Sequence, residues 1–349
     1  MYKVGIFICI FMLVACNNKD EKKGDSAFKS VEVTTIYEDS VSIRSIEIMD
    51  GGSLAFAGSE GKFGLYNPIT KVWNTSVQQV DSIKPNFRAT AHTISDFFML
   101  SIENPALLYK TGDNGRMRLV YSEENSKVFY DAMKFWNNKE GIAIGDPVDN
   151  CISILITRDA GNTWQKIDCA KLPELKEGEA AFAASNTNIS IVGNKAWIIT
   201  GGIHSRVYYS LDKGENWEVF ETPLLQGKAT QGGYSIDFYD KMTGFIIGGD
   251  YTEPELNTGN KAITQDGGIT WNLVADGNDP GYKSCVQFVP DMEGEELVSV
   301  GFTGISYTHD SGNTWEELSK EGFFTLRFLN DSIAYAAGKN RIARLNFKR

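Results

Sequence analysis

A short phrase that occurs four times constrains the fold more than any other feature of this chain. It has the pattern S/T-x-D-x-G-x-T/N-W and begins at Thr157, Ser210, Thr264 and Thr308. Its aspartates lie 53, 54 and 44 residues apart, at Asp159, Asp212, Asp266 and Asp310. A period in this range is typical of a chain built from consecutive copies of one supersecondary unit.

The phrase has the composition of a hairpin turn. An Asp side chain can accept hydrogen bonds from nearby backbone N–H groups, and Gly supplies a positive φ. The flanking residues alternate polar and apolar, as in the two strands of a hairpin. We therefore expect each of the four aspartates to shape a turn and each Trp to cover the apolar layer beneath it.

Two degraded copies precede the four clear ones. The segment 66–73 keeps the Trp, as Trp73, and the segment 111–118 keeps the Asp, as Asp113. Two further strand-like runs lie ahead of a phrase, such as 128–135 and 141–145 in the third unit. Four short strands in each unit of about 40–55 residues are typical of a blade of a β-propeller.

The two ends of the chain complement each other. Three strand-like runs follow the last phrase, at 323–329, 332–338 and 341–347, and one isolated run, 31–37, precedes the first unit. Together they make one blade, and such closure removes free sheet edges. The sequence thus predicts an all-β, seven-bladed propeller whose last blade is closed by the N-terminal strand, with six blades as the alternative.

The first residues are typical of a targeting segment. Lys3 precedes an apolar run, and Leu13-Val14-Ala15-Cys16 resembles the lipobox of bacterial lipoproteins. We expect residues 1–15 to be a signal peptide, 16–30 a lipidated Cys16 with a flexible tether, and 31–349 the propeller. This predicts a location in the bacterial cell envelope, anchored in the outer membrane and facing the periplasm or the cell surface.

Composition and motifs narrow the function classes. The formal net charge of −11 disfavours binding to nucleic acid or to anionic lipid, so membrane contact is expected through the lipid anchor only. No G-x-G-x-x-G follows a strand, and no cluster with metal-ligand spacing occurs, so we expect neither a cofactor nor a metal. We expect a monomer.

The cysteines beyond the N-terminal segment are Cys151, Cys169 and Cys285. Cys151 opens one strand of the third hairpin and Cys169 follows the other, nearly opposite across the ladder. In an oxidising envelope compartment this favours a disulfide. Cys285 lies in an apolar strand and is expected to be a buried free thiol.

The four phrases resemble the Asp-box, or BNR, repeat of sialidases and sortilin-type receptors. The order and spacing of these features along the chain are most similar to those of the photosystem II assembly-factor-like group. In that group a Phe and a Gly precede the turn, as do Phe135 and Gly141, or Phe238 and Gly244, here. Secreted bacterial relatives of that group are often labelled oxidoreductase or glycosyl hydrolase. In sialidases the Asp boxes lie away from the active site, so the resemblance implies that the four aspartates are structural.

Strand polarity then predicts where a site would lie. The face opposite the Asp turns holds the first residue of each innermost strand, expected to be Arg44, Arg88, Asp131, Glu179, Tyr234, Lys283 and Phe324. The loops between second and third strands add Glu60, Glu103, Asn104, Asp146, His204, Asp250, Tyr251 and Lys339. The longest of these loops covers residues 250–260, and long loops on a rigid scaffold usually carry binding residues.

Two functions remain open. As a glycoside hydrolase or lyase similar to sialidases, the chain would use Asp131, Glu179 and Tyr234 as catalytic residues, but the Arg-Ile-Pro motif of sialidases is absent after Arg88. The favoured hypothesis is an envelope lipoprotein that acts as a binding or assembly scaffold for a protein or glycan partner. Its candidate binding residues are Arg44, Arg88, Asp146, His204, Asp250, Tyr251 and Lys283. Arg206, at the head of a third strand, is expected to be a strand-edge charge.

Overall fold

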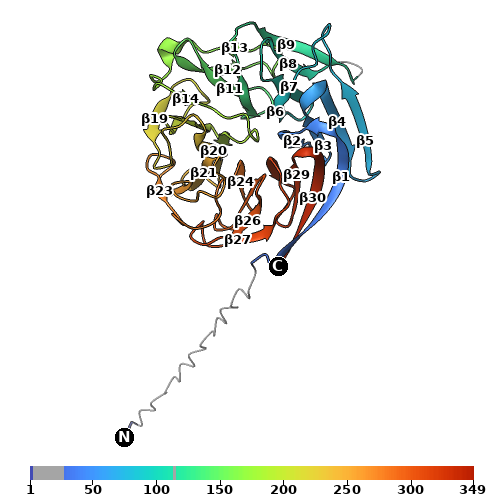
Figure 1. Cartoon of the computed structure of the whole chain (residues 1–349). Coiled ribbons are helices and arrows are strands. Elements are labelled where there is room, and N and C mark those ends of the chain that lie inside the picture. Colours follow the sequence, from blue (N-terminus) through green and yellow to red (C-terminus); the bar gives the residue numbers. More distant parts are fainter. Residues whose placement is uncertain (3–26, 113–114) are drawn as a thin grey trace.

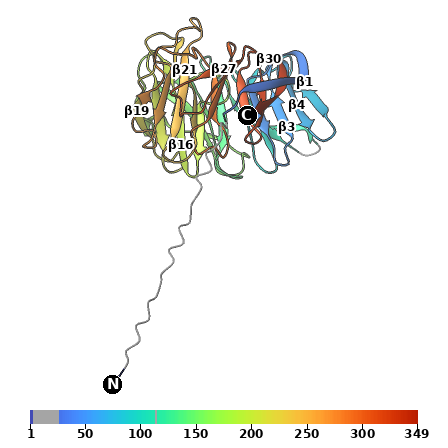
Figure 2. The same cartoon turned by 90° about the horizontal axis from the view of Figure 1, so that it is seen from below.

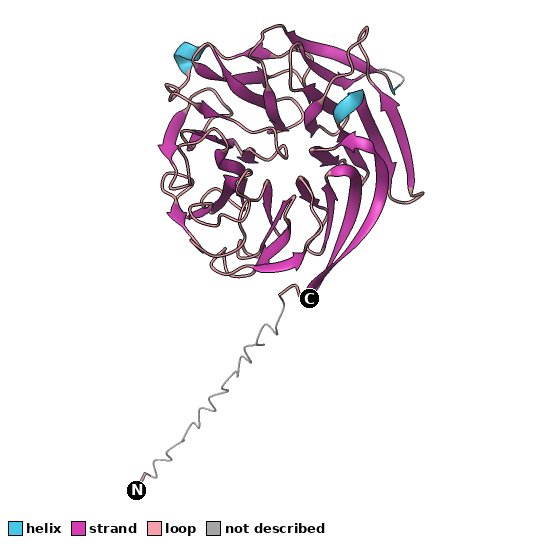
Figure 3. Cartoon of the chain, viewed as in Figure 1, coloured by secondary structure: helices cyan, strands magenta, loops and turns pink. Residues whose placement is uncertain are grey.

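The structure is a computed structural model that describes residues 1–2, 27–112 and 115–349. Within these residues, seven antiparallel sheets stand as blades around a central axis (Figure 1). Helix is confined to short 3-10 turns such as η1 (Ser59–Gly61) and η3 (Cys169–Lys171) (Figure 3). The prediction of an all-β, seven-bladed propeller is confirmed, and the six-bladed alternative is wrong because segment 66–73 does belong to a complete blade.

The first three blades follow one another in the sequence, and each runs from its innermost to its outermost strand. Blade 1 consists of β2 (Ser45–Ile48), β3 (Leu54–Ala57), β4 (Lys62–Asn67) and β5 (Val72–Val77). Blade 2 consists of β6 (Phe87–His92), β7 (Phe97–Ser101), β8 (Ala106–Thr111) and β9 (Met117–Glu123). Blade 3 consists of β10 (Tyr130–Phe135), β11 (Gly141–Val148), β12 (Cys151–Thr157) and β13 (Gln165–Lys166).

Blades 4 to 6 repeat this order with one addition. Blade 4 consists of β15 (Ile189–Val192), β16 (Lys195–Ile199), β18 (Arg206–Ser210) and β19 (Glu218–Glu221). Blade 5 consists of β20 (Gln231–Phe238), β21 (Gly244–Asp250), β22 (Lys261–Thr264) and β23 (Asn272–Leu273); the pair β14 (Glu179–Ala180) and β17 (Gly201–Gly202) extends its sheet. Blade 6 consists of β24 (Cys285–Phe288), β25 (Leu297–Gly301), β26 (Gly304–Thr308) and β27 (Glu316–Ser319).

Blade 7 joins the two ends of the chain. It consists of β28 (Thr325–Phe328), β29 (Ile333–Ala337), β30 (Lys339–Lys348) and, outermost, the N-terminal strand β1 (Ser30–Ser42). Val31 pairs with Phe347 in this ladder, and Figure 2 shows β1 and β30 together at the outer side of the ring. Phe28, just before β1, is also buried and stacks on Phe347 at 4.8 Å, so the chain packs against blade 7 before the first strand begins.

The four repeated phrases form turns with one shared hydrogen-bond pattern. In the first, the Asp159 carboxylate accepts bonds from the backbone N–H of Thr163 at 2.9 Å and from its hydroxyl at 2.8 Å. The hydroxyl of Thr157 donates to the same carboxylate, and Thr157 accepts from the N–H of Gly161. Equivalent bonds surround the other turn aspartates, Asp212, Asp266 and Asp310. We call the side of the ring that carries these turns the Asp-turn face.

The phrase also holds neighbouring blades together. Phe98 of blade 2 meets Trp164 of the first phrase, with ring centroids 6.4 Å apart, and Phe135 of blade 3 at 4.7 Å. Gly161 has φ +71°, and a Cβ there would lie 2.2 Å from the Phe98 ring. The glycine of the phrase is therefore required both by the turn and by this close approach.

Candidate binding site at the mouth of the central channel

A single segment blocks the central channel. Residues 181–188, between β14 and β15, turn inward, and we call them the plug; in Figure 1 this yellow-green stretch reaches toward the centre of the ring. Asn186 is fully buried and has φ +58°, a left-handed conformation that Asn tolerates better than most residues. Its side-chain amide donates to the Thr90 carbonyl at 2.8 Å and accepts from the Met133 N–H at 2.9 Å. It therefore ties blades 2 and 3 to the plug.

The same segment is bonded to the opposite side of the ring. The Ser185 hydroxyl donates to the Ser284 carbonyl of blade 6 at 2.6 Å, and the Thr325 hydroxyl of blade 7 donates to the Ser185 carbonyl at 2.8 Å. Thr187 donates to the Ser235 hydroxyl of blade 5 at 2.8 Å. The plug therefore divides the channel into two separate hollows, one on each face.

The hollow on the face opposite the Asp turns is an open cup of about 270 Å³, which we call the channel-mouth cup. Ala183 and Ala184 of the plug contribute to it, and so do the starts of innermost strands, because these strands begin at this face. The lining consists of small, aromatic and arginine side chains, namely Arg44, Arg88, Phe182, Ala183, Ala184, Tyr234, Tyr251, Tyr282, Phe302 and Phe324. Five of these residues, Arg44, Arg88, Tyr234, Tyr251 and Phe324, were expected at this face from the sequence, and the first four of them are candidate binding or catalytic residues.

Aromatic rings form most of the wall. Phe182 and Tyr234 stack face to face with centroids 4.0 Å apart, and Tyr282 meets Tyr234 edge-on at 4.9 Å. Phe302 continues the row, 5.3 Å from Tyr282. Tyr251 and Phe302 remain about half exposed, at 46% each. Amphipathic rings of this kind are enriched at interfaces because they bury a large area while ordering few torsions.

Two arginines supply the charge of the cup. The Arg44 guanidinium lies over the Phe324 ring at 4.0 Å and donates to the Ala184 carbonyl at 3.3 Å. Its buried Nε has no acceptor among the described residues. Burial, with repulsion from Arg88 as the smaller cause, lowers the Arg44 pKa to about 10. Because no carboxylate compensates Arg44 in the described part of the chain, the cup favours an anionic group.

Glu179 does not belong to the cup, and its predicted place was wrong. The innermost strand of blade 4 is β15, whereas Glu179 lies earlier, on the inserted strand β14. Its carboxylate is fully buried and accepts two bonds from Arg206 Nε at 3.1 Å and one from the Thr200 hydroxyl at 2.6 Å. The reading of Arg206 as a strand-edge charge was also wrong, because this guanidinium is buried against Glu179. Both side chains are already engaged in a structural ion pair.

Asp131 lies behind the wall of the cup rather than on its rim. Its side chain is fully buried, and neither carboxylate oxygen has a hydrogen-bond partner among the described residues. Burial, with the neighbouring Asp146 as a second cause, raises the Asp131 pKa well above its usual value, while Arg88 opposes the shift. Burial also raises the Asp146 pKa to about 6, although Asp146 accepts a bond from the Ala181 N–H at 2.9 Å.

The remaining candidate binding residues do not line the cup. Asp250 is fully buried and accepts bonds from Thr252, which shapes the start of the long loop. His204 lies in the turn between β17 and β18. Lys283 is buried and donates to the Gly304 carbonyl at 3.0 Å, and burial lowers its pKa to about 8. It lines a separate cavity of about 360 Å³ between blades 5 and 6.

Two of the three cysteines among the described residues form a disulfide, and the third lies in an innermost strand. Cys151, the first residue of β12, and Cys169 of η3 are joined by a disulfide with Cα atoms 5.5 Å apart. Cys285 is a buried free thiol, and burial raises its pKa. Cys16 and the predicted signal peptide lie outside the described residues.

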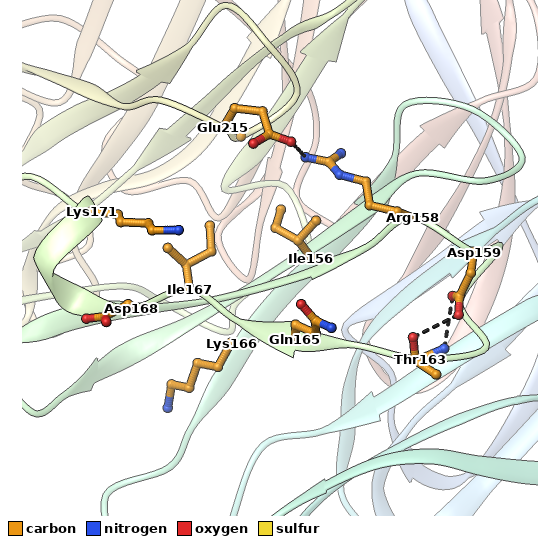
Figure 4. Close-up of a pocket in the computed structure, with 11 residues that line it drawn as sticks. Ile156, Arg158, Asp159, Thr163, Gln165, Lys166, Ile167, Asp168, Lys171 and Glu215 are labelled. Carbon is orange, nitrogen blue, oxygen red and sulfur yellow. Dashed lines mark hydrogen bonds and ion pairs between the residues drawn. The ribbon is translucent and has the colours of Figure 1, made fainter.

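A larger cavity, of about 470 Å³, lies outside the channel, between blades 3 and 4 (Figure 4). Asp159 lines it, yet its carboxylate points to Thr163 within the turn (Figure 4). Arg158 is paired with Glu215 at 3.0 Å on the other side. Lys166, which also lines this cavity, pairs with Glu123 at 2.6 Å, whereas the Lys171 ammonium has no such partner among the described residues.

Neither a metal site nor a membrane span emerges from the described residues. No group of three or more His, Cys, Asp or Glu side chains there is arranged to hold a metal ion. Among the same residues, no helix is long and apolar enough to cross a membrane.

Comparison with known proteins supports the fold. No protein-family model and no curated protein sequence matches this chain. Among solved structures, YCF48 bound to D1 peptide superposes with a TM-score of 0.66 at 13% identity, covering 92% of this chain and 96% of that one. YCF48 from Cyanidioschyzon merolae gives 0.61 at 12% identity, covering 91% and 98%, and the RRP9 WD40 repeats give 0.61 at 10%, covering 91% and 98%. At these identities, the likeness shows the β-propeller fold that this chain shares with them.

Proposed function

We propose that this chain is a non-enzymatic binding scaffold that presents the channel-mouth cup to an acidic segment of a protein partner. The observation that carries the proposal is the cup itself, in which stacked aromatic rings surround an uncompensated guanidinium above a closed floor. A structure with the same fold, YCF48, is described as bound to a D1 peptide, which adds support for a peptide ligand here.

The chemistry of the cup selects an acidic side chain next to an apolar or aromatic one. A carboxylate at Arg44 would accept from the buried Nε, which otherwise keeps a donor unsatisfied. The half-exposed rings of Tyr251 and Phe302 would contact the neighbouring side chain. Charge complementarity would also speed the encounter with the partner.

The glycoside hydrolase alternative receives no support from the cup. Glycosidases canonically place two carboxylic acids on either side of the scissile bond. Here Glu179 is held by Arg206, and Asp131 is buried behind Arg88, so neither carboxylate faces the hollow. Of the three candidate catalytic residues, only Tyr234 lines the cup, and its hydroxyl donates to the Thr230 carbonyl at 2.7 Å.

The anchoring of the scaffold is part of the proposal. The lipobox-like residues ending at Cys16 would hold a monomeric propeller in the bacterial outer membrane, facing the periplasm or the cell surface. Metabolic labelling with an alkyne-tagged fatty acid should label the wild-type chain and not Cys16→Ser. Equal labelling of both chains would refute the anchor.

A peptide-display screen on the purified full chain tests the binding function. The enriched sequences should place Asp or Glu beside an aromatic or aliphatic residue. Arg44→Met keeps an apolar stem but removes the charge, and it should weaken binding of an enriched peptide at least about tenfold.

Arg158→Met is the matched control, because Arg158 lies at the cavity between blades 3 and 4 and should leave the affinity unchanged. Affinity that survives Arg44→Met would place the peptide elsewhere. If an acidic-glycan array binds through Arg44 while no peptide does, the partner is a glycan and the protein-partner proposal fails.

A further inference from the structure

The second hollow of the channel lies on the Asp-turn face, beyond the plug, and we call it the lower chamber. It has a volume of about 280 Å³. Ile48, His92, Phe288 and Phe328, each the last residue of an innermost strand, line it together with Glu47, Asp237, Gln287, Pro290 and Arg327. Since these strands begin at the cup and end here, the chamber is separate from the cup.

The acidic groups of the chamber are already engaged. Glu47 is paired with His92, with Oε2 and Nδ1 3.0 Å apart, and its other oxygen accepts from the Asn186 amide at 3.3 Å. The Asp237 carboxylate accepts from the backbone N–H of Phe288 at 2.9 Å. The hydrogen-bond acceptors that face this hollow are therefore largely occupied.

Several donors, by contrast, have no acceptor. Lys134 does not itself line the chamber, but its ammonium interacts through space with the lining residues Arg327, Asp237 and Glu47 and has no hydrogen-bond or close ion-pair partner in the described part of the chain. Burial first, and repulsion from Arg327 second, lower the Lys134 pKa. Gln287 accepts from the Phe328 N–H at 3.2 Å through Oε1, and within the described ranges its amide nitrogen donates to no residue.

Arg327 is held in place by hydrogen bonds and still has N–H groups that donate to no acceptor among the described residues. Its Nη1 donates to the Leu326 carbonyl at 2.7 Å and to the Thr325 hydroxyl at 3.0 Å, and its Nη2 donates to the Asn186 carbonyl of the plug at 3.1 Å. A guanidinium carries five N–H donors, so part of its fork is not used by these bonds. Only 8% of Arg327 is exposed, which makes it a pre-positioned cation in the wall of the chamber.

We propose that the lower chamber binds a small carboxylate with a short apolar tail, a ligand site distinct from the cup. The carboxylate would accept bonds from Arg327 and the Gln287 amide, and the nearby Lys134 ammonium would attract it, which relieves the repulsion between the two cations. The tail would lie against Phe288 and Phe328 at the mouth, beside Ile48 and Pro290. The plug closes the far end, so the ligand enters from the Asp-turn face.

Calorimetry on the full-length protein with three six-carbon probes tests the head group. Hexanoate should bind, while hexanamide and hexylammonium should bind at least about tenfold more weakly, because neither brings an anion to the unpaired donors. Lys134→Met should weaken hexanoate binding by a similar factor. Lys139→Met, an exposed lysine five residues along the same blade, should leave it unchanged.

A crystal soaked with 6-bromohexanoate locates the site without any mutation. A bromine anomalous peak in the lower chamber would support the proposal even if Lys134→Met failed to fold. A peak only in the cup beside Arg44, no peak at all, or equal binding of hexanoate and hexanamide would overturn it.

Discussion

The aspartates of the four repeated turns and the buried pair Asp131 and Asp146 behind the cup have opposite environments. Burial tends to raise the pKa of each turn aspartate, but hydrogen bonds from the turn outweigh it and hold the pKa below its usual value, as at Asp159 and Asp266. Behind the cup, Asp131 has no hydrogen-bond partner among the described residues, and Asp146 has a raised pKa. The repeated residue thus stabilises a turn, while the unrepeated ones lie in destabilising positions next to the proposed binding surface.

This contrast separates aspartates that stabilise the fold from aspartates that lie beside the proposed binding surface. A buried, unsatisfied polar group in a native protein calls for an explanation, and binding sites often contain one. Arg88 lines the cup and interacts through space with Asp131, so this carboxylate helps to set the charge of the cup's wall. The four repeated turns leave no aspartate carboxylate without hydrogen bonds, because every copy forms the same set of bonds.

The largest loss of stability is expected at Glu179, whose buried carboxylate is hydrogen-bonded and ion-paired. Glu179→Ala leaves the Arg206 guanidinium buried without its partner, and such a loss costs about 3–5 kcal/mol. Denaturant titration should show the free energy of unfolding falling by that amount. Glu215→Ala, an exposed partner of Arg158, should cost less than about 1 kcal/mol. Equal effects of the two variants would contradict a structural role for Glu179.

Asp266→Ala should have the next largest effect. It removes an acceptor used by the Thr270 N–H and by the hydroxyls of Thr270 and Thr264. Hydrogen bonds to charged groups contribute about 1.5–3 kcal/mol, and the free energy of unfolding should fall within this range. Asp50→Ala, at an exposed turn of blade 1, serves as the control and should change little. An unaltered free energy for Asp266→Ala would show that the turn forms without its carboxylate.

Asp146→Asn should act in the opposite direction and stabilise the protein. The folded-state pKa of about 6 lies above the usual 3.8, so the folded state holds the proton more tightly, and stability falls as pH rises from about 4 to 6. With allowance for partial exposure, the variant should gain about 1–2 kcal/mol at pH 7 and lose this pH dependence. Asn can still accept from the Ala181 N–H.

The turn aspartates supply the matched comparison for this pH effect. Because the Asp266 pKa is lowered in the folded state, its contribution is present above the usual pKa and is lost as the pH falls below it. Unfolding free energies measured from pH 3 to 7 for Asp266→Asn and Asp146→Asn should therefore diverge in opposite directions. Parallel curves would remove the distinction between the turn aspartates and Asp146.

Tyr251→Ala should have the smallest effect on stability. The ring is 46% exposed at the rim of the cup, so the free energy of unfolding should change by no more than about 0.5 kcal/mol. Affinity for a peptide enriched in the display screen should nevertheless fall clearly, measured by calorimetry. Unchanged affinity would remove Tyr251 from the binding surface.

The repeated features of the fold were predictable from the sequence. Each copy of the phrase imposes the same turn, and the period counts the blades, so even segment 66–73, which lacks the Asp, could be placed. Arg44, Arg88 and Tyr234 followed from strand polarity alone, since innermost strands begin at one face. Tyr251 could be predicted because the loop that follows β21, residues 250–260, was expected on the face opposite the Asp turns.

The plug could not be predicted, because it belongs to no repeat. The link from β13 to β15 covers residues 167–188, whereas the corresponding link from β19 to β20 covers only residues 222–230. This extra length was the available signal, and Glu179 was misplaced because the alternating residues around it resemble an innermost strand. The pairing of Glu179 with Arg206 depends on tertiary contacts between β14 and blade 4, and no local sequence pattern predicts it.

Site-specific photo-crosslinking in cells shows directly whether a protein partner meets the channel-mouth cup or the Asp-turn face. A photoreactive amino acid replaces Tyr251 at the rim of the cup or, in a second strain, Ile269, which is 51% exposed in an Asp turn. We expect one defined protein adduct from position 251, lost when Arg44→Met is added, and none from position 269. An adduct from position 269 alone would place the binding surface on the Asp-turn face and contradict the account.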